Sequence, residues 1–171
     1  MSQRPTTWTM SAAVVLLLVT SPPAALGGTP ITKSPGKQAK LSKVQKEHLL
    51  DGEYRIVRRV AEIPAAVRSA FAGADFEMAN PGEPFQVTDV VMEKLPWRRL
   101  VFAGCARSRC FLHYEKGGYA HGYYVVVFDL SRTDDATFYW GGALFNAASD
   151  ILELRSMIGT GHVLDDKPFY W

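Results

Sequence analysis

The chain has little cysteine, no surplus of one charge and only one long apolar run. It contains two cysteines, and 19 basic residues stand against 17 acidic ones, so the formal net charge is +2. This balance gives no reason to expect nucleic acid or an anionic membrane surface as a partner. The motifs of serine hydrolases, zinc proteases and phosphate-binding loops are also absent. We therefore expect no metal, no cofactor and no enzymatic activity.

The single long apolar run predicts a secretory signal peptide. It covers residues 12–19, follows one positive charge at Arg4, and precedes a Ser-Pro-Pro break. Ala25 and Gly27 are the small residues that a signal peptidase accepts, which predicts cleavage after Gly27. A membrane span needs about 20 apolar residues, so an uncleaved anchor is the weaker alternative. We expect a periplasmic or secreted protein without a membrane span after cleavage.

The remainder divides into a leader and a single domain. Residues 28–40 are rich in Pro, Gly, Ser, Thr and Lys and bury too little apolar surface to offset the entropy of ordering. They are predicted to be a flexible leader, whereas residues 41–171 are long enough for one domain with its own core. Short apolar stretches separated by polar or glycine breaks predict antiparallel hairpins. The predicted fold is α+β, an antiparallel meander sheet of about five strands with flanking helices.

Residue type and spacing give the expected boundaries. Helices are expected over residues 41–50, 63–73 and 147–158, with a glycine ending each of the last two. An arginine-rich edge strand is expected over 54–60, because charge discourages edge-to-edge pairing. Further strands are expected over 85–91, 99–103, 111–115, 119–129 and 137–140. The aromatic tail, residues 162–171, is expected to dock on the domain.

Both cysteines lie in one short segment, with four residues between Cys105 and Cys110. In an exported protein they should form a disulfide, and the apolar flanks place it at the tip of a hairpin. A loop this small gains less stability than the roughly 3 kcal/mol of a 15-residue loop, so a rigid tip is the better reason for the bond. The tip carries Arg107, Ser108 and Arg109, and the arginine fork suits carboxylates. The alternative is a stapled turn with solvated arginines.

The export signal, the small α+β domain and the strand–Cys-x4-Cys–strand hairpin resemble the inhibitors of vertebrate lysozyme found in bacterial periplasms. The resemblance covers about residues 100–140. It implies a loop that enters a lysozyme cleft, where a loop histidine meets the catalytic carboxylates. The position of that histidine falls on Ser108 in this sequence. Arg107 or Arg109 would then have to address the acidic groups.

The segment 113–124, His-Tyr-Glu-Lys-Gly-Gly-Tyr-Ala-His-Gly-Tyr-Tyr, is the most distinctive in the chain. Its double glycine suits a two-residue hairpin turn, where positive φ is required. Such a turn places Tyr114 opposite His121 and Leu112 opposite Tyr123. We interpret the first pair as a hydrogen-bonded cross-strand contact that stabilises the sheet.

The same register separates the two histidines of this segment. His113 and Glu115 project from the opposite face, because side chains alternate along a strand. The histidines therefore do not converge, and we expect no metal site. The alternative is acid–base chemistry, either by His121 with Tyr114 or by His113 with Glu115.

These observations predict an exported small binding protein that inhibits a lysozyme-like or other envelope hydrolase through its disulfide-closed loop. Its partner would be a protein of the envelope or of host secretions, and the oligomeric state stays open. One alternative is a small periplasmic hydrolase that uses the histidine, tyrosine and glutamate side chains of the hairpin. Another is a structural envelope component. The expected binding residues are Arg107, Ser108, Arg109, His113, Tyr114, His121 and Tyr123.

Overall fold

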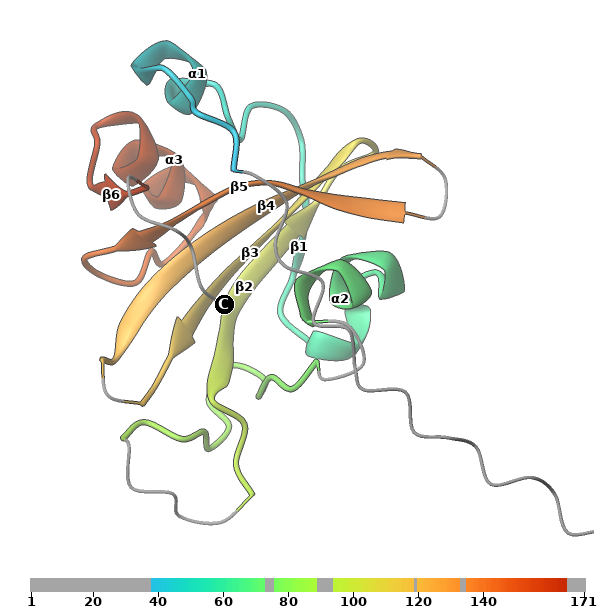
Figure 1. The fold of residues 1–171 in the computed structure, drawn as a ribbon, viewed down its shortest axis with the longest axis vertical. Helices are drawn as coiled ribbons and strands as arrows, with labels where there is room; N and C mark the ends of the chain where they lie inside the picture. Colours follow the sequence, from blue (N-terminus) through green and yellow to red (C-terminus); the bar gives the residue numbers. More distant parts are fainter. Residues whose placement is uncertain (1–37, 73–75, 89–93, 119, 133–134, 166–171) are drawn as a thin grey trace, which may run out of the picture.

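The chain forms an α+β domain around one six-stranded antiparallel sheet (Figure 1). The computed structural model describes residues 38–72, 76–88, 94–118, 120–132 and 135–165. The strands follow each other in sequence order, so the sheet is the predicted meander with six strands instead of about five. The predicted signal peptide, residues 1–27, and the final residues of the tail lie outside the described part.

The described strands are β1 (Arg55–Val57), β2 (Arg98–Cys105), β3 (Arg109–Lys116), β4 (Gly122–Arg132), β5 (Asp135–Leu144) and β6 (Val163–Leu164). The helices are α1 (Lys43–Glu47), α2 (Ala65–Ala72) and α3 (Ile151–Gly159), with a 3-10 turn at Val60–Glu62. Apart from the strand predicted over residues 85–91, the predicted helices and strands therefore form at their expected places, with shifted ends.

Helices cover the sheet on both faces, which creates two cores. Phe111 and Val125 belong to a cluster with buried residues of α3, on the same face as α1. Leu112 and Val126, one residue further along each strand, belong to a second cluster with buried residues of α2. Because both faces are buried, β3 and β4 carry continuous apolar runs in place of the alternation of a half-exposed sheet.

The predicted strand over residues 85–91 is wrong for its described part, 85–88. The backbone of this segment makes separate hydrogen bonds and not the regular series of a strand. Gln86 N donates to Pro96 O, and Gly118 N donates to the carbonyl of Val87. It therefore lies across the end of the sheet near the β3–β4 connection and joins no ladder. Apolar composition alone does not distinguish such a covering segment from a strand.

The last helix begins later than the predicted Ala147. Asp150 is its N-cap, and the Asp150 carboxylate accepts from the amides of Leu152 and Glu153 at 2.9 Å. The residues before Asp150 connect β5 to the helix. Because an N-cap residue has non-helical backbone dihedral angles, the helix cannot extend back through Asp150 to Ala147. At the other end Thr160 is the C-cap and Gly161 takes a positive φ, so Gly159 is the last helical residue and not the cap.

The described ends of the domain are both attached to β5. Ala39 N donates to Tyr139 O at 3.1 Å, and the Gln38 amide donates to Gly141 O at 2.7 Å. These two residues thus belong to the ordered part, although their composition placed them in the flexible leader. Asp165, just after β6, accepts from the Trp140 indole at 2.9 Å and pairs with an α1 lysine. The described start of the tail, up to Asp165, is therefore docked, whereas the aromatic residues 168–171, on which the prediction rested, lie outside the described residues.

Candidate functional site

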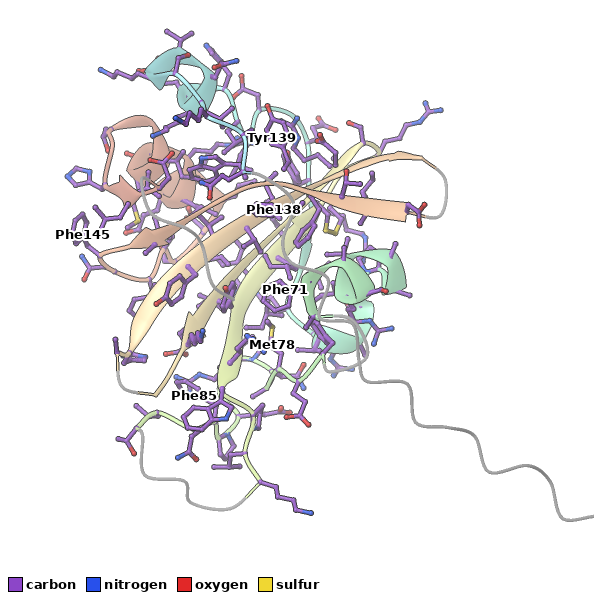
Figure 2. All side chains as sticks on the ribbon, viewed as in Figure 1. Phe71, Met78, Phe85, Phe138, Tyr139 and Phe145 are labelled. Atoms are coloured by element: carbon purple, nitrogen blue, oxygen red, sulfur yellow. A yellow bond between two sulfur atoms is a disulfide. The ribbon has the colours of Figure 1, made fainter. Side chains whose placement is uncertain are left out.

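The predicted disulfide between Cys105 and Cys110 is present, at the turn that joins β2 to β3. The two residues are also cross-strand partners in the sheet. Two hydrogen bonds hold the residues between them: Ala106 N donates to Arg109 O, and Leu130 N of β4 donates to Ser108 O, both at 2.8 Å. The turn is therefore fixed by a covalent bond and by main-chain contacts on two sides. Figure 2 shows the disulfide as a yellow bond.

Arg109 is held by its own domain. Its Nε donates to Asp129 at 3.1 Å, and a terminal nitrogen donates to Leu49 O at 3.0 Å. Its guanidinium also lies over the Tyr139 ring, 4.8 Å from the centroid, at the upper end of the sheet in Figure 2. Breaking three contacts to free this side chain would be costly, so Arg109 braces the turn instead of reaching a partner.

Arg107 and Ser108 are exposed at the apex of the turn. No hydrogen bond or ion pair joins the Arg107 side chain to another residue in the described part of the chain. Ser108, at the position that the resemblance gives to a histidine, contributes its carbonyl to the bond with β4. As far as the described residues show, the turn thus presents one unbonded guanidinium, that of Arg107, on a rigid base.

Neighbouring segments flank this turn on both sides. Arg55 at the start of β1 pairs with Cys105, and Arg109 pairs with Asp129 of β4. The β4 and β5 strands continue to Arg132 and from Asp135, beyond the point where β4 bonds Ser108. The disulfide turn is therefore part of a broad end of the sheet and not an isolated finger.

At the opposite end of the sheet, the β3–β4 hairpin has a different register from the predicted one. Lys116 pairs with Gly122, so the connection has five residues in place of two. Tyr114 pairs with Tyr124 instead of His121, and Leu112 pairs with a valine instead of Tyr123. The predicted tyrosine–histidine pair is therefore wrong. The register differs from the predicted one by an odd number of residues. Each β3 side chain therefore shares a face of the sheet with the β4 side chains that were predicted to lie on the other face.

As a result, Glu115 and His121 meet. His121 Nε2 lies 3.1 Å from Glu115 Oε2, and Arg99 Nε donates to the other carboxylate oxygen. The Glu115 side chain is 8 % exposed, whereas that of His121 is 38 % exposed. A buried carboxylate is thus bonded on both oxygens and aligns a histidine that reaches solvent. The prediction that Glu115 and His121 lie on opposite faces is wrong.

Aromatic rings surround this group. Tyr123, paired with Glu115, has its ring centroid 5.5 Å from the His121 ring. Phe85 lies against His121 at 6.1 Å and under the Arg99 guanidinium at 4.4 Å, at the lower end of the sheet in Figure 2. The sequence did not indicate Arg99 or Phe85 as members of this group. Arg99 reaches Glu115 only because of the strand register, and Phe85 reaches His121 only because the segment 85–88 covers this end of the sheet.

His113 has a structural environment. It is fully buried, its Nδ1 donates to Tyr124 O, and its Nε2 accepts from Ala148 N, each at 2.9 Å. Burial lowers the pKa of His113, so the ring is neutral with its proton on Nδ1. Both nitrogens are occupied by the backbone, so the predicted binding residue His113 has no atom left for a ligand. Tyr114 is also fully buried, on the α2 face.

Within the described residues, no group of three or more His, Cys, Asp or Glu side chains could hold a metal ion. In the same part of the chain, no helix has the length and apolar character of a membrane span. Comparisons with protein-family models, with curated proteins and with solved structures found no match to this chain.

Proposed function

We propose that the chain is an exported small binding protein that inhibits a lysozyme-like or other envelope hydrolase through its disulfide-closed turn. The observation that supports this proposal is the contrast between the two arginines of the turn. Arg109 is tied to Asp129, Leu49 and Tyr139, whereas Arg107 is exposed and unbonded within the described residues. The side chain that can reach a partner is therefore Arg107.

Rigidity favours binding, because an ordered loop loses little conformational freedom when a complex forms. The disulfide, the Ala106–Arg109 bond and the Leu130–Ser108 bond fix the turn before any partner arrives. A guanidinium offers a planar fork that pairs with a carboxylate through two hydrogen bonds. We therefore propose that Arg107 pairs with an acidic group at the partner's active site while the flanking strands cover its rim.

The test uses the purified protein against a panel of lysozymes of different structural types, with inhibition and binding measured together. Arg107→Ala should weaken both about tenfold or more, because a charge-assisted pair is lost. Arg59→Ala is the matched control, because Arg59 is an exposed arginine beyond the other end of β1. Equal loss in both variants, or no binding to any lysozyme, would count against the proposal.

A second candidate function is acid–base chemistry by Glu115 and His121, supported by their 3.1 Å contact. A carboxylate that orients a histidine is the usual arrangement of a general base, and the exposed part of the His121 ring is open to a reactant. Arg99 donates to the other carboxylate oxygen and so holds the Glu115 side chain in this orientation. A neighbouring nucleophile is not evident among the described residues, so the reactant would be a water molecule or the substrate itself.

This second function is tested by assaying ester and glycoside substrates with Glu115→Gln and His121→Ala. Loss of turnover in both variants, with an acid limb in the pH–rate profile of the parent protein, is the expected result. Arg107→Ala serves as control, because it lies at the other end of the sheet. If no substrate is turned over, or if both variants keep the parent rate, the dyad has a structural role.

A further inference from the structure

On the sheet face covered by α2, a half-buried arginine has no bonded counter-charge among the described residues. Arg98 opens β2, its Nε is buried without a hydrogen-bond partner, and its guanidinium lies 5.3 Å from the Phe71 ring centroid. No carboxylate of the described residues lies within ion-pair distance of it, and Glu77 acts on it only through space. Desolvation lowers the pKa of Arg98, because burial disfavours the charged form of the guanidinium, although the charge of Glu77 opposes this shift.

A second buried donor lies beside Arg98. Tyr114 on β3 is fully buried, and its hydroxyl has no hydrogen-bond partner in the part of the chain that the structure describes. Burial strongly raises the pKa of Tyr114, so the phenol is neutral and can donate. Its ring centroid is 5.3 Å from that of Phe71, so both polar side chains lie against the same aromatic ring, labelled in Figure 2.

The register explains why these groups are close. Arg98 pairs with Lys116 and Leu100 pairs with Tyr114, so Arg98 and Tyr114 are diagonal neighbours on one face. Lys116 adds a second positive charge, and its pKa is lowered by burial and by the charge of Arg98. The described surroundings of Arg98 thus hold the positive charge of Lys116 and the negative charge of Glu77, which is not within ion-pair distance.

Buried polar groups are nearly always hydrogen-bonded, and an unpaired buried charge is costly. Arg98 has only donors to offer, and the Tyr114 hydroxyl can donate as well. One acceptor that carries a negative charge would therefore satisfy both groups. An internal water could bond to the phenol, but it would leave the charge of Arg98 without a counter-ion.

We propose that Arg98 and Tyr114 bind a monocarboxylate between α2 and the sheet, with its oxygens accepting from the guanidinium and from the phenol. This site lies at the opposite end of β2 from the disulfide turn, so it is independent of the proposed inhibitor function. A carboxylate matches the planar fork of the Arg98 guanidinium. The surrounding side chains of Phe71, Phe76 and Met78 favour a carboxylate with an apolar body.

The experiment titrates the full chain with benzoate, acetate and inorganic phosphate, with chloride keeping the ionic strength constant. Calorimetry and the thermal unfolding midpoint report binding. We expect saturable binding of benzoate, weaker binding of acetate, and no saturable binding of phosphate. Tyr114→Phe should weaken benzoate binding roughly fivefold, the usual effect of one lost hydrogen bond. Arg98→Met should abolish it, and Arg59→Met should leave it unchanged.

The unliganded variant gives a second readout. Because the Tyr114 hydroxyl is unpartnered, Tyr114→Phe should leave the unfolding midpoint unchanged or raise it when no ligand is present. A lowered midpoint would show that the hydroxyl already has a partner, and this result would overturn the proposal. Benzoate binding that survives Arg98→Met, phosphate binding as tight as benzoate binding, or no saturable binding of any anion would overturn it as well.

Discussion

The imidazole of His113 accepts a hydrogen bond from the backbone amide of Ala148 at 2.9 Å. On its other side the ring donates to Tyr124 O on β4. One buried side chain thus connects β3, β4 and the segment that leads into α3. Ala148 is itself fully buried, so its amide would lack a partner without this histidine.

This arrangement predicts acid-dependent stability. The native pKa of His113 is lowered by burial, so the unfolded chain binds a proton more readily than the native state does. In the unfolded chain the histidine pKa is about 6.5. The free energy of unfolding should therefore be highest above this pH and should fall as the pH drops below it. Urea unfolding from pH 8 to pH 5 measures the slope.

His113→Gln separates this contribution from those of the other histidines and the carboxylates. The variant should be less stable at pH 8 by about 1–3 kcal/mol, because a glutamine side chain cannot place its donor and its acceptor where the two ring nitrogens bond Tyr124 O and Ala148 N. Its stability should also depend less on pH between 6.5 and 5 than that of the parent. An unchanged pH slope would show that His113 keeps an ordinary pKa.

The two arginines of the disulfide turn should differ in their effect on folding. Arg109→Ala removes an ion pair, a main-chain hydrogen bond and a ring contact, and should lower the free energy of unfolding by about 1–2 kcal/mol. Arg107→Ala should leave it unchanged, because the side chain is exposed and unbonded among the described residues. Chemical denaturation of both variants checks this; equal stability losses would contradict the assigned roles.

Removal of the disulfide should affect binding more than stability. The double variant Cys105→Ala, Cys110→Ala opens a loop with four residues between the cysteines, and the chain-entropy relation gives about 2 kcal/mol for it. The sheet should persist, because Cys105 and Cys110 lie within a ladder that continues on both sides. Circular dichroism and denaturation measure the two effects. Loss of the sheet would show that the disulfide is required for folding.

Gly117 should not tolerate a side chain. An added Cβ would lie 1.8 Å from Gln86 O, a backbone atom of the covering segment. Gly117→Ala should therefore displace that segment and lower stability by roughly 2 kcal/mol or more. Gly159→Ala is the control, because its Cβ would meet mainly the flexible side chain of Glu47, and should leave stability unchanged or raise it. Thermal unfolding of both variants compares them.

The sequence by itself determined the class of the fold and the position of the disulfide. Apolar runs in β3 and β4 are long enough to predict strands, and short polar breaks between them permit only antiparallel neighbours. The spacing of Cys105 and Cys110 places the bond at a hairpin tip whatever the details of the sheet. These features depend on local residue type and on connection length.

Only the tertiary structure decided which side chains meet. A double glycine allows several turn lengths, because glycine adopts positive φ freely, as Gly118 does at 103°. The connection of five residues moved Glu115 beside His121. Packing likewise decided that Arg109 is bonded, and that within the described residues Arg107 has no bond and the buried Arg98 Nε has no acceptor. Such contacts depend on strand register and on the packing of separate elements, so composition and periodicity carry no record of them.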